Sequence, residues 1–314
     1  MLKYFRPFLL VFVVFFVGIL SSCQQDFFTK SISDSDEGFM EFNVLTSDAI
    51  ATKAISDGTM VDVLYYAVYK NGEELVDLRP AEPVKRGTDG RFVFKIKLVK
   101  GLSYKVAFWA QCSECTAYDL TDFEAMTISY SGPANDERRD AFFKTEDVML
   151  TSNTQVTEVV LKRPFAQINF AALDYNVVTP LLDDKGFTST ISLKGVPNVL
   201  NLLTGETSGS VDISYDFSPA PSGEDEFFDS NKLLRYVSMN YILAEKEKRV
   251  YTQDPLIGEF KYGSVNLQIP IHNLPVQRNY RTNILGYLFS ADILFNVDLD
   301  EIFDDNTNSK YPKQ

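Results

Sequence analysis

The chain is poor in the residues that most enzyme sites need, with one histidine, one tryptophan and three cysteines among 314 residues. A serine-type triad requires an imidazole base, and the single candidate, His272, lies beside a turn. A zinc site needs four ligands, but Cys112 and Cys115 have no second CxxC motif to complete one. No glycine-rich loop that could cradle a phosphate is present. We therefore expect no enzyme activity, no metal and no cofactor, and a hydrolase would require a pair of carboxylates in a cleft.

Basic residues are also scarce. Lysine and arginine total 30 against 43 aspartates and glutamates, which gives a formal net charge of −13. Binding to nucleic acid needs a cationic surface, so the composition argues against a nucleic-acid partner. Hydrophobic residues make up 45% of the chain and aromatic residues 13%, a mixture that favours strands over helices.

The long apolar run of the sequence is at its start, from Phe8 to Leu20, after the cationic Lys3 and Arg6. At about a dozen residues the run fits a signal peptide and is too short to span a bilayer. Leu20-Ser21-Ser22-Cys23 then resembles a bacterial lipobox, which predicts a lipoprotein signal peptide over residues 1–22. Cys23 would carry diacylglycerol and palmitate chains that anchor the protein in the outer membrane. The alternative is an ordinary secretory signal followed by an incidental cysteine.

If Cys23 is acylated, Cys112 and Cys115 are the remaining cysteines. Their CxxC spacing in an exported protein allows a local disulfide, a redox site or half of a metal site. The pair follows an expected strand, Tyr104 to Ala110, with no helical period after it, so the thioredoxin-like context is missing. The spacing therefore favours a disulfide at the tip of a loop or two free thiols.

After Cys23 the sequence reads as a polar tether over residues 23–37, then as many short strands separated by turn signals. Lys162-Arg163-Pro164 is the best boundary between domains, because proline disfavours a central strand and a new alternation begins after it. We therefore predict an all-β chain with two tandem β-sandwich domains, over residues 38–163 and 164–303, and a polar tail over 304–314. One short helix is expected from Asn135 to Phe143. The expected strands include Phe39–Leu45, Val61–Tyr69, Phe92–Leu98, Tyr104–Ala110, Val156–Leu161, Ile168–Ala172, Ser189–Leu193, Val211–Phe217, Arg235–Leu243, Val265–Ile269, Asn279–Leu285 and Ile293–Leu299. The single tryptophan, Trp109, is expected in the core.

Several strings in the mature chain resemble the Bacteroidales-type fimbrillins, which are type V pilin-like surface lipoproteins. They are Ala51-Thr52-Lys53-Ala54-Ile55-Ser56-Asp57-Gly58, the strand Tyr65–Tyr69, Phe108-Trp109-Ala110-Gln111, Asn135-Asp136-Glu137-Arg138-Arg139-Asp140-Ala141-Phe142, Lys162-Arg163-Pro164-Phe165-Ala166-Gln167-Ile168-Asn169 and Asn279-Tyr280-Arg281-Thr282-Asn283-Ile284-Leu285-Gly286. The resemblance implies two transthyretin-like or Ig-like sandwiches and a role as a fimbrial subunit or anchor at the outer membrane.

The resemblance also implies a route of assembly with other fimbrial subunits. In that family a protease cuts after a basic residue in an N-terminal loop, the first strand leaves, and a strand from a neighbouring subunit replaces it. Lys53 is the matching position, so the mature chain would begin at Ala54. The expected donor strand presents Ile293, Phe295, Val297 and Leu299 to alternate pockets. The alternative is that Lys53 is only an exposed loop lysine; the family's cleavage often follows arginine.

A different class of function fits the same signals. A monomeric surface lipoprotein that binds glycan or a host protein would also carry a lipid at Cys23 and a strand-rich mature chain. Exposed coplanar aromatic side chains and a saturable ligand would mark that protein, whereas high-mass species that resist mild detergent would mark a fimbrial subunit.

Overall fold

The computed structural model describes residues 36–47, 58–133, 136–174, 176–178, 180, 187–217, 228–229, 234–289 and 295–300. The predicted signal peptide, Cys23, most of the tether, the Lys53-Ala54 pair, Ile293 and the polar tail lie outside the described residues. From Gly38 onward the chain forms one compact unit. The described part is nearly all β-strand, which confirms the predicted fold class of β-sandwiches. Among the described residues, no helix has both the length and the apolar character needed to cross a membrane.

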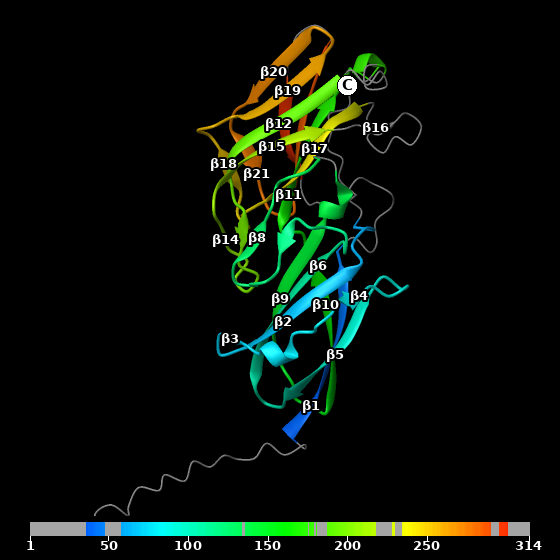
Figure 1. The fold of residues 1–314 in the computed structure, drawn as a ribbon, viewed down its shortest axis with the longest axis vertical. Helices are drawn as coiled ribbons and strands as arrows, with labels where there is room; N and C mark the ends of the chain where they lie inside the picture. Colours follow the sequence, from blue (N-terminus) through cyan, green and yellow to red (C-terminus); the bar gives the residue numbers. More distant parts are fainter. Residues whose placement is uncertain are drawn as a thin grey trace, which may run out of the picture. The chain divides into compact units, whose positions relative to one another are not determined.

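The first half of the chain builds a sandwich from two sheets (Figure 1). One sheet has the strand order β10-β1-β5, formed by Thr154–Leu161, Glu37–Thr46 and Phe92–Val99. The other has the order β3-β2-β6-β9, formed by Glu73–Glu74, Val63–Lys70, Ser103–Gln111 and Ala141–Met149, and β4 (Val84–Lys85) also pairs with β2. Side chains that alternate along these strands meet in one buried core.

The second half builds another sandwich. One sheet has the order β16-β17-β11-β22-β23, formed by Phe228–Asp229, Leu234–Leu243, Phe165–Ala172, Arg281–Gly286 and Phe295–Asp300. The facing sheet has the order β15-β12-β19-β20, formed by Val211–Phe217, Phe187–Val196, Leu256–Tyr262 and Val265–Ile271. A two-stranded sheet pairs β18 (Arg249–Tyr251) with β21 (Leu274–Val276). Every residue of β11 is buried, as expected of a central strand covered on both faces.

Two insertions, one from each half, share a sheet between them. The insertion after β6 carries β7 (Tyr118–Asp119) and β8 (Met126–Ile128), and the insertion after β12 carries β13 (Val199–Leu200) and β14 (Thr207–Ser208). Because β8 pairs with β13, these short strands form one sheet of order β14-β13-β8-β7. The two halves are therefore joined by backbone hydrogen bonds as well as by the chain.

Side chains at this junction continue the core from one half into the other. Trp109 of β6 is fully buried, which confirms its expected place in the core, and its ring lies 5.0 Å from that of Tyr118 and 6.3 Å from that of Phe165. Phe165 in turn lies 6.4 Å from Tyr241 of β17. The change of sheet falls between the end of β10 at Leu161 and the start of β11 at Phe165, next to the predicted boundary at Pro164.

The predicted helix from Asn135 to Phe143 is wrong. A 3-10 helix covers only Glu137–Arg139, and Asp136 caps it by accepting a hydrogen bond from the Arg138 N–H. Strand β9 then begins at Ala141. Phe142 is buried in the core of the first sandwich, and Ala141 is buried in the core that contains Trp109 and Phe165. The turn capped by Asp136 therefore ends after three residues, and the chain continues as a strand.

Candidate functional site

The strand that the sequence singles out for exchange, β1, is the central strand of its sheet. It is hydrogen-bonded to β10 on one side and to β5 on the other. The pairing with β10 is parallel and runs without a register shift from Phe39 opposite Thr154 to Thr46 opposite Leu161. A central strand that leaves exposes two rows of backbone donors and acceptors, one on each neighbour.

The inner face of β1 is apolar and completely buried. Met40, Phe42 and Val44 have no exposed surface. The Phe42 ring stacks on Phe94 of β5 with centroids 5.4 Å apart and meets the edge of Phe108 of β6 at 5.3 Å. Full burial of each such side chain is worth about 1.5–3 kcal/mol. The space that β1 occupies is thus an apolar trough with an aromatic floor.

The two ends of β1 are fixed by backbone contacts. The Phe39 N–H donates to the Asn153 carbonyl at 2.9 Å, and the Ser47 N–H donates to the Leu161 carbonyl at 3.1 Å. At Gly38 the chain passes so close to the turn before β10 that an added Cβ would lie 2.7 Å from the Asn153 carbonyl oxygen. The start of β1 therefore needs glycine for close packing.

Polar contacts on the rim of the trough complete the site. Glu41 on the outer face of β1 forms an ion pair with Lys95 of β5 at 3.1 Å. Arg86 donates from Nη2 to Thr46 Oγ1 at 3.3 Å and from Nη1 to the Gly58 carbonyl at 3.1 Å. These two acceptors stand on either side of residues 48–57, so one guanidinium holds both ends of the segment that contains Lys53. Arg86 could not be recognised from the sequence, because an arginine before a glycine in a loop belongs to no strand alternation and to no motif.

Lys53 and Ala54 themselves lie outside the described residues, as does the lipidation candidate Cys23. Their connectivity still matters, because residues 48–57 form the covalent link between β1 and β2. A cut after Lys53 would leave β1 attached to the rest of the fold by noncovalent contacts alone.

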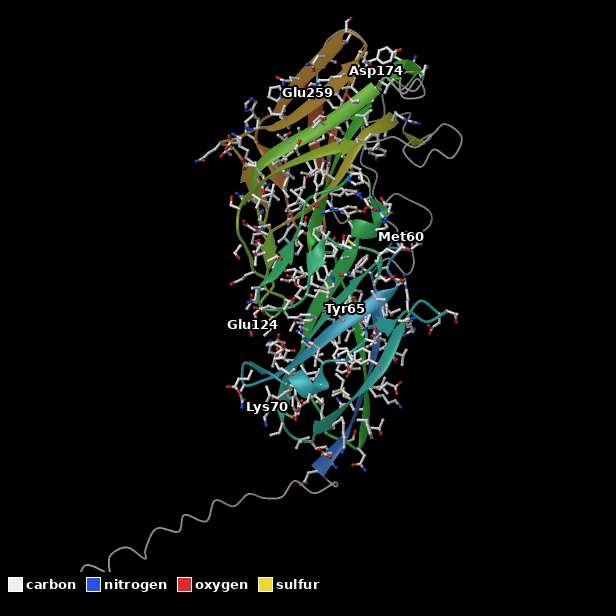
Figure 2. The ribbon with its side chains drawn as sticks, viewed as in Figure 1. Met60, Tyr65, Lys70, Glu124, Asp174 and Glu259 are labelled. Carbon is white, nitrogen blue, oxygen red and sulfur yellow. The ribbon has the colours of Figure 1, made fainter. Side chains whose placement is uncertain are left out.

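The predicted donor strand is an edge strand of the second sandwich. The backbone of Phe295, Val297 and Leu299 lies in β23, which pairs antiparallel with β22 and has no second neighbouring strand among the described residues. Val297 lies opposite Ile284 and packs against the buried core, and Leu299 lies opposite Thr282. Leu288 and Phe289 are the last described residues before β23, and Asp174 holds them in place (Figure 2). Its carboxylate accepts hydrogen bonds from their N–H groups at 3.0 and 2.8 Å.

Cys112 and Cys115 lie in a turn that directly follows β6, and both are free cysteines. Cys112 is buried and Cys115 is half-buried. His272 is exposed in the turn between β20 and β21. Among the described residues, no group of three or more histidine, cysteine, aspartate or glutamate side chains is placed to hold a metal ion. The described residues expose two large aromatic side chains, Phe39 at 46% and Tyr287 at 38%.

Comparisons with known proteins agree with this fold. A family model described as "Family of unknown function (DUF6562)" matches residues 34–313. No curated protein matches the chain by sequence. Solved structures similar to the chain include Bacteroidales fimbrial and adhesion proteins.

One of these structures is a "putative cell adhesion protein" from Bacteroides uniformis. It has a TM-score of 0.51 at 8% identity, and the match covers 85% of this chain and 98% of that one. The tip fimbrial protein Mfa3 from Porphyromonas gingivalis has a TM-score of 0.47 at 10% identity, with coverage of 84% and 99%. A fimbrial assembly protein from Parabacteroides distasonis has a TM-score of 0.47 at 13% identity, also with coverage of 84% and 99%. At these identities the likeness concerns the fold.

Proposed function

The chain belongs to the family of unknown function DUF6562, and from the position of β1 in its fold we propose that it is a structural subunit or anchor of a surface fimbria. In this proposal a lipid on Cys23 first holds the protein at the outer membrane, where it joins other fimbrial subunits. As an anchor it keeps this lipid and β1. As a polymerising subunit it is cut after Lys53, loses the lipid together with β1, and its first sandwich accepts a donated strand in place of β1. The role is docking, with no catalytic chemistry.

The observation that carries the proposal is the placement of β1. It is the first strand of the described chain, yet it lies in the middle of its sheet and contributes three fully buried side chains to the core. Its link to β2 runs through residues 48–57, which contain the basic Lys53. A single cut in this link would leave β1 without a covalent connection to β2. The loss of β1 would leave an apolar trough and two open strand edges, which a strand from another subunit could fill.

The expected donor is β23 of a neighbouring subunit. As an edge strand it has fewer backbone hydrogen bonds to break than a central strand such as β11. Its alternate residues Val297 and Leu299 share one face, as Met40, Phe42 and Val44 do on β1. A donated strand with this alternation would refill the trough at positions now held by β1.

Electron microscopy and gel analysis of cells that express the protein test this function. We expect fibres, and ladders of high-mass species that resist mild detergent, from the unaltered chain. A Lys53→Ala variant should lose both if cleavage precedes assembly. The matched control is Lys246→Ala, because Lys246 is an exposed loop lysine far along the chain from β1.

The amino terminus of the surface material separates the two fimbrial roles. A polymerising subunit should begin at Ala54. An anchor should begin at a lipidated Cys23 and keep β1, and Lys53→Ala should then leave its assembly unchanged. A protein that stays monomeric on the surface and binds a saturable ligand would contradict both roles.

A further inference from the structure

The turn that holds Cys112 and Cys115 is arranged for a chemical change that strand exchange does not use. We propose that these two cysteines form a reversible intrachain disulfide, with Cys115 as the thiol that attacks a small disulfide oxidant and Cys112 as the thiol that resolves the intermediate. The bond would then fix the turn at which the insertion that carries β7 and β8 begins, and would do so under redox control.

The backbone already brings the two residues together. The Cys115 N–H donates to the Cys112 carbonyl at 3.1 Å, which closes a four-residue turn. Such turns place their first and last Cα atoms within about 7 Å, and a disulfide spans Cα separations of roughly 4.4–6.8 Å. Closing the bond therefore requires little movement of the chain.

Neighbouring side chains hold the turn at three points. Gln111 Nε2 donates to the carbonyls of Cys112 and Cys115 at 3.3 and 3.2 Å. The middle of the turn is fixed by Asp62, whose carboxylate accepts from the Ser113 N–H at 2.6 Å and from its hydroxyl at 2.7 Å. Because the turn is held in the reduced protein, little conformational freedom remains to be lost on oxidation.

The two thiols differ in access, which assigns their roles. Cys112 is 4% exposed, whereas Cys115 lines an open polar cavity of about 300 Å³ together with Glu114, Ser131, Asp136 and Arg138. Of the two thiols, Cys115 is therefore the one that a disulfide in solution would meet first. Burial raises the pKa of the Cys115 thiol, and a hydrogen bond from the Ala117 backbone and the charge of Arg139 oppose this shift. The attack should therefore be slow at neutral pH and accelerate as the pH rises.

The reaction balances without any group from the protein other than the two thiols. The Cys115 thiolate attacks one sulfur of a disulfide such as oxidised glutathione, forms a mixed disulfide and releases one thiol. The Cys112 thiolate then attacks the Cys115 sulfur and releases the second thiol. Two protein thiols are oxidised, one disulfide is reduced to two thiols, and both protons pass to the released thiolates.

Trp109 provides a built-in reporter, because its indole N–H donates to Gln111 Oε1 at 2.7 Å and Gln111 holds both cysteine carbonyls. It is the only tryptophan of the chain.

The test uses the full chain with Cys23→Ser, so that Cys112 and Cys115 are the only thiols. This protein is equilibrated in glutathione buffers of varied total concentration. As the buffer becomes more oxidising, we expect both thiols to stop reacting with an alkylating reagent at the same point. The oxidised fraction should follow the ratio of oxidised glutathione to the square of reduced glutathione. The fluorescence emission of Trp109 should change in parallel.

Single variants complete the test. With Cys112→Ser the product should stop at a glutathione adduct on Cys115, and with Cys115→Ser the buried Cys112 should react at least tenfold more slowly. Thiols that stay free across the series, a mixed disulfide as the end product of the unsubstituted pair, or bonds only between chains would overturn the proposal. A failure of strand exchange at β1 would leave all of these results unchanged.

Discussion

At the scale of single residues, Phe42 is the clearest point of attachment of β1. Its side chain is fully buried and its ring contacts Phe94 and Phe108 from two different strands. Phe39, three residues earlier on the same strand, is 46% exposed and stands on the opposite side of it. The two phenylalanines thus form a matched pair for measuring what the inner face contributes.

We predict that Phe42→Ala lowers the free energy of unfolding of the uncut protein by about 3–5 kcal/mol, because the cavity left in the core does not fully close. Phe39→Ala should cost less than about 1 kcal/mol. Urea denaturation at constant m-value measures both. Equal losses from the two variants would mean that the inner face of β1 does not support the first sandwich.

A buried ion pair marks the connection between the two halves. Arg163 donates from Nε and Nη2 to the two carboxylate oxygens of Asp140, both at 2.7 Å, and the two side chains are 0% and 1% exposed. The guanidinium also lies 4.4 Å from the centre of the Phe142 ring. Two charges this deeply buried depend on each other, because the loss of one leaves the other desolvated without compensation.

Replacing Arg163 with methionine should therefore destabilise the protein by about 3–5 kcal/mol. The double variant Arg163→Met with Asp140→Leu should be more stable than the single variant, since it does not leave Asp140 as a buried charge without its partner. Glu158→Ala serves as the surface control, because the ion pair of Glu158 with Arg91 is exposed and worth about 0–1 kcal/mol. If the double variant has a lower free energy of unfolding than the single variant, then lost hydrogen bonds, and not the burial of an unpaired charge, account for most of the destabilisation.

At the scale of elements, the start of β1 depends on Gly38. A Cβ at this position would meet two backbone oxygens, those of Asn153 at 2.7 Å and Ser152 at 2.9 Å, and neither can rotate away. We expect Gly38→Ala to push the first residues of β1 off the sheet at a cost of about 1–3 kcal/mol. Hydrogen exchange should show it as faster exchange of the Phe39 amide, with the amides of β22 unchanged. Unchanged protection at Phe39 would show that the turn before β10 adapts instead.

Strand alternation predicted several of the long strands, including β1, β5 and β15, because each has a buried face that recurs every second residue. It missed β9, whose first residues were expected in a helix, and β19, which contains Gly258. An added Cβ at Gly258 would lie 3.1 Å from the Phe170 ring. It also missed the two- and three-residue strands at the junction, such as β8 and β13. Strands that short contain no period, and their pairing is set by contacts distant in sequence.

The candidate site was predictable only in part, for the same reason. Local patterns and a family resemblance predicted the strand β1, and they pointed to Lys53 and the donor segment as candidates. The parallel pairing of β1 with β10 and its central place between β10 and β5 depend on how distant strands assemble. Arg86, which holds both ends of the segment around Lys53, could be found only from the coordinates.

At the scale of the whole molecule, the junction should make the two sandwiches unfold together. The Ile128 N–H donates to the Asn198 carbonyl at 2.8 Å, the Leu202 N–H donates to the Phe123 carbonyl at 2.8 Å, and Thr145 Oγ1 donates to the Leu202 carbonyl at 2.5 Å. We predict a single calorimetric transition with equal calorimetric and van't Hoff enthalpies.

Leu200→Pro, which removes a backbone donor on the side of β13 that pairs with β8, should separate this unfolding into two transitions. Scanning calorimetry of the variant and of the unaltered chain under the same conditions measures the difference. Two transitions already present in the unaltered protein would contradict the coupling.

The most direct test of strand exchange is native mass spectrometry of protein cut after Lys53 and mixed with a synthetic peptide of residues 291–302. The account predicts that the fragment containing β1 is released and one peptide is captured per chain, whereas a peptide with Val297→Asp and Leu299→Asp is not captured. A β1 fragment that stays bound while neither peptide associates would contradict it.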